Sequence, residues 1–339
     1  MEIPTRFSEA ELERPAGIPE DAILRVLRVA PEQAGMRLDV FVQSQLRNTS
    51  RTRARAIVES GAFTPDGRRL RPNDRVRAED RVVLWRKPFE EDALDSSLPI
   101  LYEDEALLVI DKPPFVAVHP SARYYRSTLI KRLAAQRPGE YLALVHRLDR
   151  ETSGIVLVAR SLEADRAFKR AFEERSLSQG SATVRKTYLA ITWGVPEPGL
   201  VARPLELDPT SALRVKMRIA EPGQGLEART RLEILETKKG YALVACELET
   251  GRQHQIRVHL ASLGCPVVGD KLYGPDERIL ARAADRKLLA DDLVRLELPR
   301  HALHAHRYRL THALSGQPLD LISPLPADLK NFWDCLDEA

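Results

Sequence analysis

Two short apolar runs enclose a charged loop in the segment Leu142-Ala143-Leu144-Val145-His146-Arg147-Leu148-Asp149-Arg150-Glu151-Thr152-Ser153-Gly154-Ile155-Val156-Leu157-Val158-Ala159. Short apolar runs bounded by polar residues are typical of buried strands. The segment therefore predicts two strands, at 142–145 and 155–159, joined by a polar loop. Loops that a rigid sheet holds in place often carry catalytic side chains.

Within this loop, Asp149 has three possible roles that its neighbours do not separate. It is a candidate nucleophile, a candidate general base, or one half of a structural ion pair with Arg147 or Arg150. Local chemistry favours the ion pair, because carboxylates beside arginines are common. The tripeptide Arg-Leu-Asp also occurs at residues 37–39, so three letters alone do not identify a site.

The pattern on both sides of the loop predicts the fold class. Further strands are expected at 107–110 and 187–193, and helical spacing of apolar residues predicts helices at 162–175 and 253–263. Strands and helices alternate without a regular βαβ rhythm or a glycine-rich nucleotide loop. We therefore expect an α+β catalytic domain at 100–330, with a large mixed, mainly antiparallel sheet flanked by helices.

A second, smaller unit precedes that domain. Residues 87–99 are polar, acidic and bracketed by prolines, which is typical of a linker. Before them, residues 34–86 contain the pattern of two short helices, a turn at Asp66-Gly67 and a strand at 82–85. Ser50 is the expected N-cap of the second helix. We expect a small α+β domain over 34–86.

The charge of the chain is concentrated in this small unit. The net charge is +3, but twelve basic and five acidic side chains between Arg47 and Lys87 give this stretch +7 and leave −4 for the rest. A basic module on a slightly acidic body suggests a part that binds a polyanion. Charge alone leaves open a second interpretation, a solvated arginine-rich face.

The residues of the small unit resemble an S4 domain, an RNA-binding fold. The resemblance rests on Arg37-Leu38-Asp39, on Ser50-Arg51-Thr52-Arg53-Ala54-Arg55, on Gly61 and on Asp66-Gly67, where Asp66 stands in place of the usual Asn. It implies that arginines on the second helix, namely Arg51, Arg53 and Arg55 in line with Arg47, bind RNA.

The charged loop of the larger domain resembles the signature of the RluA-type family of pseudouridine synthases. Three further segments agree with that family in order and spacing, and they are 107–113 with 118–120, 186–190 and 248–259. The similarity runs from about Ile100 to Pro326. It departs from the family pattern at Asp111, at His312-Ala313 and at Tyr124-Tyr125-Arg126, where a turn containing glycine is usual.

This resemblance implies a reaction and the residues that carry it out. In that reaction the N1–C1′ bond of a uridine breaks, the base turns, and C5 joins C1′. The family match gives Asp149 as the catalytic carboxylate, Arg257 as its basic partner and Tyr188 as the residue that packs against the base. It also makes Arg147 the side chain that fills the space of the extruded uridine, and it places Arg252 among the RNA-binding residues.

The resemblance implies no metal or other cofactor. A metal site among His301, His304 and His306 is not predicted, because no Cys or carboxylate falls at a matching ligand spacing. For Tyr188 and Arg257 the alternatives are a half-buried strand residue and an exposed helix residue. Both are minority interpretations once the family match is considered.

Three functions remain in competition. The first is a pseudouridine synthase acting on structured RNA, with large-subunit ribosomal RNA favoured because an S4 domain is attached. The second is the same chemistry on a transfer RNA, and the third is a non-catalytic RNA-binding or assembly factor. Three scattered cysteines, no long apolar stretch and no apolar run behind Met1 predict a cytoplasmic protein that does not span a membrane. Nothing implies an obligate protein partner, so a monomer is expected.

Overall fold

The computed structural model describes residues 12, 14–20, 22–46, 49–86, 91, 97–120, 124–174, 184–211, 213 and 215–336. The chain divides into two compact units, Met1–Glu91 and Asp92–Ala339. The division falls within the segment 87–99 that we expected to be a linker, most of which lies outside the described residues.

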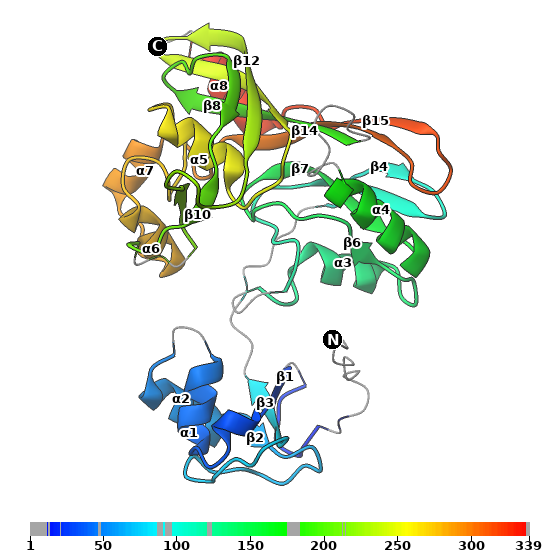
Figure 1. Ribbon diagram of the computed structural model, residues 1–339, viewed down its shortest axis with the longest axis vertical. Helices are drawn as coiled ribbons and strands as arrows, with labels where there is room; N and C mark the ends of the chain where they lie inside the picture. The colour runs from blue at the N-terminus through cyan, green and yellow to red at the C-terminus, as the bar shows by residue number, and fades with distance from the viewer. Residues whose placement is uncertain are drawn as a thin grey trace. The chain divides into compact units, whose positions relative to one another are not determined.

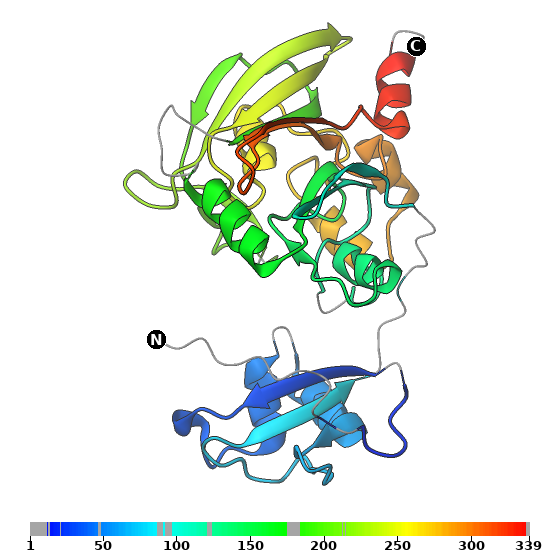
Figure 2. The same cartoon turned by 90° about the vertical axis from the view of Figure 1, so that its right-hand side faces the viewer.

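The first unit is a three-stranded sheet with two helices (Figures 1 and 2). Its elements are β1 (Ile23–Arg28), the short 3-10 helix η2 (Pro31–Gln33), α1 (Leu38–Gln45), α2 (Arg51–Gly61), β2 (Ala62–Phe63) and β3 (Arg81–Arg86). The strand order is β1-β3-β2, and all pairs are antiparallel. The sequence analysis did not include β1, because it started the unit at residue 34. Only Leu27 of this strand is buried, so the sequence ILRVLR lacks the pattern of alternating or continuous apolar residues by which a buried strand is predicted.

The two helices of this unit follow from their sequence. The Ser50 side chain accepts a hydrogen bond from the backbone N–H of Arg53 at 3.2 Å, as expected of an N-cap. Ala54 and Val58 of α2 are fully buried and belong to the same core cluster as Phe41 of α1. The opposite face of α2 leaves its arginines in solvent.

The first copy of the Arg-Leu-Asp tripeptide is a structural ion pair. Asp39 is only 1% exposed, and it accepts hydrogen bonds from the guanidinium of Arg37 at 3.1 and 2.9 Å. Arg51 lies 3.7 Å from the same carboxylate. Here the sequence neighbour neutralises the aspartate, which is the arrangement that local chemistry favoured for Asp149 as well.

The second unit is built on a ten-stranded sheet among the described residues (Figure 1). Its strands are β4 (Ile100–Glu103), β5 (Leu107–Lys112), β6 (Ala143–Leu144), β7 (Ser153–Ala159), β8 (Val184–Trp193), β9 (Gly199–Ala202), β12 (Arg229–Lys238), β13 (Tyr241–Leu248), β14 (Leu303–Thr311) and β15 (Pro318–Ile322). The main order is β4-β5-β7-β14-β8-β13-β12-β9, with β15 beside β14 and β6 beside β7. Among the strands of the described residues only the pair β7–β14 is parallel, so this sheet is mixed and mainly antiparallel.

Helices and a small second sheet complete this unit. They are α3 (Leu129–Gln136), α4 (Leu162–Glu174), α5 (Gln255–Ser262), α6 (Arg278–Ala284), α7 (Ala290–Leu296), α8 (Ala327–Cys335) and the strand pair β10 (Leu205–Leu207) with β11 (Met217–Ile219). Helix α4 packs against β7, and α5 packs against β11 and β12. In the described part of the chain, no helix has the length and apolar character needed to cross a membrane.

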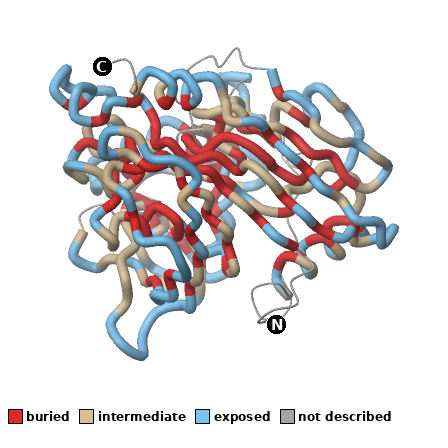
Figure 3. The backbone as a smooth tube through the Cα atoms, turned by 90° about the horizontal axis from the view of Figure 1, so that it is seen from above, coloured by how far each residue is buried: buried red, intermediate tan, exposed pale blue. Residues whose placement is uncertain are grey.

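Strand β7 lies at the centre of the core. All seven of its residues are buried, and buried residues continue along neighbouring strands (Figure 3). Gly154, at the start of β7, has φ +106°, and a Cβ there would lie 2.3 Å from the carbonyl oxygen of Ala305 in β14. Only glycine permits this close approach, which fixes the end of the charged loop against β14.

The helix expected at 253–263 is shorter at its start. Helix α5 begins at Gln255, because His254 has a left-handed backbone with φ +56°. The side chain of Gln255 accepts hydrogen bonds from the Thr250 hydroxyl at 2.8 Å and from the backbone N–H of Arg252 at 3.0 Å. These bonds close the turn before α5 and set where its first residues lie.

Candidate active site

A buried lysine anchors the charged loop between β6 and β7. Lys112, at the end of β5, is 0% exposed and donates hydrogen bonds to the carbonyls of Pro113 at 2.8 Å, Val116 at 2.9 Å and Arg150 at 3.2 Å. Burial lowers the pKa of Lys112 well below its ordinary value. The lysine thus connects the segment after β5 to the loop that carries Asp149.

Asp149 pairs with a residue that is distant in the sequence. Its carboxylate accepts a hydrogen bond from Nη1 of Arg257, on α5, at 2.9 Å. The side chain of Arg257 is only 7% exposed, so the exposed-helix interpretation of this arginine is wrong. Arg150 instead lies 3.4 Å from Glu151. Asp149 therefore does form an ion pair, but with an arginine of α5, whereas local chemistry suggested Arg147 or Arg150.

A second aspartate holds the other side of the same guanidinium. Asp270 is 0% exposed and accepts hydrogen bonds from Nε of Arg257 at 2.6 Å and from Nη2 at 2.7 Å. Oδ1 of Asp270 also accepts from the backbone N–H groups of Leu272 and Tyr273. A guanidinium held at two nitrogens by a fixed carboxylate has one orientation, and in that orientation Nη1 points at Asp149.

His254 lies on the other oxygen of Asp149. Its Nε2 is 3.8 Å from Oδ1 of Asp149, and its Nδ1 is 2.8 Å from the hydroxyl of Tyr273. The guanidinium of Arg257 lies over the Tyr273 ring, 5.1 Å from its centre. The left-handed backbone of His254 turns this side chain toward the loop instead of along the helix.

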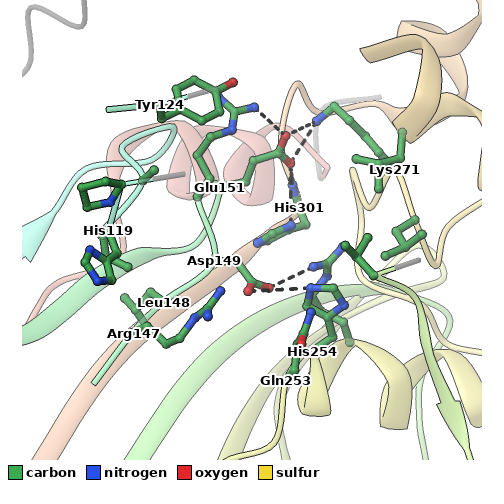
Figure 4. Close-up of a pocket in the computed structure, with 18 residues that line it drawn as sticks. His119, Tyr124, Arg147, Leu148, Asp149, Glu151, Gln253, His254, Lys271 and His301 are labelled. Carbon is green, nitrogen blue, oxygen red and sulfur yellow. Dashed lines mark hydrogen bonds and ion pairs between the residues drawn. The ribbon is translucent and has the colours of Figure 1, made fainter. Parts of the chain in front are cut away.

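Two cavities meet at Asp149. The smaller is about 80 Å³, and its lining includes Tyr188, Leu248 and Leu303. The larger is about 490 Å³, and its lining includes His119, Tyr124, Lys271 and His301 (Figure 4). The residues common to both are Arg147, Leu148, Asp149, His254 and Arg257. The carboxylate is therefore placed to act on a molecule that enters either space.

Comparison with known proteins gives this site its family. Residues 106–262 match the family described as RNA pseudouridylate synthase, and residues 36–82 match the S4 domain. A protein of Xanthomonas campestris pv. campestris named ribosomal large subunit pseudouridine synthase D is 34% identical, over 94% of this chain and 95% of its own. The chain belongs to the RNA pseudouridylate synthase family. It is an isomerase that acts on RNA.

Other relatives agree with this assignment. A Pseudomonas aeruginosa protein with the same name is 35% identical to the enzyme, over 91% of this chain and 94% of its own. The structure of human RNA pseudouridylate synthase domain containing 4 superposes with a TM-score of 0.54 at 28% identity, covering 70% of this chain and 92% of that one. The α+β fold that the sequence predicted is that of a pseudouridine synthase.

The site keeps Asp149 ionised. Burial alone would raise its pKa, but His254 and His301 in the acid range where they are protonated, together with the charge and the hydrogen bond of Arg257, lower it to about 2. Burial also lowers the pKa of His254 to about 4 and that of His301 to about 3. Both imidazoles are therefore neutral at pH 7, and Arg257 is the cation that keeps the carboxylate of the enzyme charged.

The structure brings together five of the residues predicted for the site. Asp149, Tyr188, Arg257, Arg147 and Arg252 all line the smaller cavity. Tyr188 is a strand residue as the alternative interpretation held, but it is only 7% exposed, and its hydroxyl shares a hydrogen bond of 2.7 Å with that of Tyr308. Arg147 is exposed, and Nε of Arg252 donates to the carbonyl of Glu227 at 3.0 Å.

The arginines predicted to bind RNA in the first unit lie on α2, as expected. Arg51 is near Asp39, and Arg55 donates to Glu59 at 2.9 Å, while the side chain of Arg53 is exposed. Arg47, the fourth member of the expected row, lies outside the described residues. Two of the three described arginines thus carry an ion pair that RNA phosphates would have to compete with.

Sequence reasoning missed three residues that the site contains. His254 was quoted only as part of a motif, and no periodic signal revealed its left-handed backbone. Asp270 lies in a loop beyond the recognised motifs, and only the fold brings it to Arg257. His301 was considered for metal binding, whereas its Nε2 lies 2.7 Å from the hydroxyl of Thr152.

The other two histidines of the cluster, His304 and His306, make contacts between segments of the sheet. Nδ1 of His304 lies 2.9 Å from the hydroxyl of Ser153, and its Nε2 lies 3.0 Å from the carbonyl of Ser323. His306 reaches the same carbonyl at 2.7 Å. These contacts connect the start of β7 to the residue after β15.

Proposed function

We propose that this enzyme converts specific uridines of large-subunit ribosomal RNA into pseudouridine, with Asp149 as the catalytic group. The observation that carries the proposal is an ionised carboxylate, held by a buried arginine, on the wall shared by two cavities. The identity of the RNA is supported by the names of the relatives in Xanthomonas and Pseudomonas and by the attached S4 domain.

The reaction places clear demands on the site. The N1–C1′ bond breaks, the C5–C1′ bond forms, the proton leaves C5, and N1 finishes with a proton, so nothing is gained or lost overall. Asp149 supplies the unprotonated carboxylate that is needed either to attack a carbon or to remove a proton from the ribose. With a pKa of about 2, it is available at any pH near neutrality.

The smaller cavity is where we place the target uracil. The Tyr188 ring forms one wall, and its proposed roles are to pack against the base and to help remove the C5 proton. A uridine in folded RNA must first leave its stack, which costs a few kcal/mol. Arg147, exposed and next to Leu148 and Asp149, is proposed to fill the space that the uridine vacates. Arg252 is proposed to bind the backbone beside it.

The setting follows from the substrate. We propose that the enzyme lies in the cytoplasm, which suits a protein whose relatives are named for ribosomal RNA. We also propose that it works as a monomer.

Mapping of pseudouridines tests the function and identifies the RNA. An unmodified transcript of the large ribosomal RNA and a pool of unmodified transfer RNAs are incubated with the purified enzyme and sequenced after carbodiimide treatment. We expect pseudouridine at one or a few positions of the ribosomal transcript. Modification of the transfer RNAs alone would move the proposal to its competitor, and no modification of either would contradict it.

The arginines of α2 are expected to bind RNA through phosphates. Each arginine–phosphate contact releases counterions. Replacing Arg51, Arg53 and Arg55 by glutamine should therefore make the fall of log affinity with log salt concentration less steep, reducing the magnitude of the slope by up to about 3. Binding is measured by fluorescence anisotropy at several salt concentrations. The control is Arg278→Gln, whose side chain is 80% exposed in the second unit. An unchanged slope in the triple variant would show that these arginines are only a solvated face.

A further inference from the structure

The larger cavity has no role in the function proposed so far. If the target uracil packs against Tyr188, it occupies the smaller space, and about 490 Å³ remain on the other side of Asp149. That volume lies within the range of about 300–1,000 Å³ that small-molecule sites in proteins occupy. A cavity of this size next to a catalytic carboxylate is large enough to bind a ligand.

The charged groups on the far wall of this cavity already have partners. Nζ of Lys271 donates to both oxygens of Glu151, at 2.8 and 3.0 Å, and to the carbonyl of Pro299 at 2.6 Å. Nε2 of His301 lies against the hydroxyl of Thr152. Because three acceptors use the lysine ammonium and burial keeps the imidazole neutral, this wall does not attract a phosphate.

Polar side chains, namely His119, Arg147, Arg150 and Gln253, line another part of the cavity, and a third part of its surface is apolar and aromatic. Its members are side chains from three separate segments, namely Val118, Pro120, Tyr124, Val215, Leu272 and Leu280. Val215 is 48% exposed, so an apolar side chain stands open to solvent at the cavity. Such walls suit a flat ring, because burying apolar surface is favourable and a base can stack on an aromatic side chain.

The ring of Tyr124 is held in a position in which a base could stack on it. The Arg150 guanidinium lies over its ring, 5.2 Å from the centre, and over the ring of Phe115 at 5.5 Å. Arg150 also reaches Glu151 at 3.4 Å, and Glu151 is fixed by Lys271. Rigid aromatic groups bind with a small loss of side-chain entropy.

We propose that the larger cavity receives an unpaired nucleobase that adjoins the target uridine in the RNA, and that Tyr124 stacks on it. The proposal rests on the proposed function. It makes Tyr124 a specificity residue, because only an RNA whose neighbouring base can leave its own stack fills the cavity. Base–aromatic stacking accepts any base, so the selection is for local RNA structure more than for base identity.

The test is a double-mutant cycle that combines removal of the Tyr124 ring with removal of a neighbouring base from the RNA. Short RNAs carry the target uridine found by mapping, with a normal nucleotide or an abasic ribose on its 5′ or 3′ side. Turnover is followed as release of tritium from C5 of the target. We expect Tyr124→Ala to lower kcat/KM about tenfold or more on the normal RNA, and one abasic substitution to cost the unchanged enzyme a similar factor. Combined, the two changes should cost no more than either alone.

Two controls keep the outcome clear. Tyr124→Phe keeps the ring and should behave as the unchanged enzyme. Tyr125→Ala removes the neighbouring ring, which lies by Lys131 and does not line the cavity, and it should retain full turnover. If the losses from Tyr124→Ala and from both abasic RNAs simply multiply, or if Tyr124→Ala is fully active, the inference is wrong while the proposed function stands. Absence of turnover by the unchanged enzyme on the normal RNA would overturn both.

Discussion

Asp149→Asn is expected to make no detectable pseudouridine, even with enzyme in excess over RNA. The substitution keeps the size of the side chain and an oxygen that can accept from Nη1 of Arg257. It removes the negative charge and the basicity, so neither attack on carbon nor proton abstraction is available. Asp149→Glu displaces the carboxylate by about an ångström, which is enough to cost ~100-fold for a positioned group. Tritium release from C5 in a single turnover measures both variants.

A matched aspartate separates this effect from loss of folding. Asp292 is 2% exposed and, like Asp149, pairs with an arginine, here Arg282, but it lies outside both cavities. Asp292→Asn should retain turnover per folded molecule, and Asp149→Asn should bind RNA nearly as well as the unchanged enzyme. A normal rate of pseudouridine formation by Asp149→Asn would show that the catalytic assignment is wrong.

Arg257→Met is expected to lose both stability and turnover. It leaves Asp149 and the fully buried Asp270 without their shared cation, and removing one partner of a buried ion pair typically costs about 3–5 kcal/mol. For a unit of this size the midpoint of thermal unfolding should fall by roughly 6–20 °C. Turnover should fall at least ~100-fold, because the pKa of Asp149 rises and its position is no longer fixed.

The loss of stability should depend on pH in a definite direction. In the unchanged enzyme the pKa values of Asp149 and Asp270 lie below their ordinary values, so these groups stabilise the fold above pH ~4 and cease to do so as the pH falls further. Without Arg257, burial raises both pKa values, and the carboxylates destabilise the fold when they are ionised. The difference in unfolding free energy between the two proteins should therefore be larger at pH 7 than at pH 4.

Two further variants test the geometry of this pair. Arg257→Lys restores a charge but not the three nitrogens that contact two carboxylates, so it should recover stability better than turnover. Arg282→Met breaks the matched pair with Asp292 and should lower stability without lowering turnover per folded molecule. A fully active Arg257→Met enzyme would mean that Arg257 does not support Asp149 in catalysis.

Local pattern in the sequence determined much of this protein. Apolar runs of strand length flanking a charged loop predicted β7 and placed Asp149 beside it, because burial on both faces of a central strand demands a continuous apolar run. Ser50 predicted the start of α2, because a capping hydroxyl acts on a backbone N–H only three residues away. Family motifs added the reaction and identified Arg257 as a partner.

Only the tertiary structure decided how the site is assembled. Asp149 and Arg257 are 108 residues apart, and their contact depends on the order of strands that carries β7 and α5 to one place. The same loop chemistry at residues 37–39 gives an ion pair with the adjacent arginine, so sequence neighbours do not settle which cation an aspartate finds. Asp270 and His254 act through a buried hydrogen bond and a left-handed backbone, and neither leaves a periodic trace in the sequence. Electrostatic partners are chosen by distance in space and by burial, which a linear pattern does not contain.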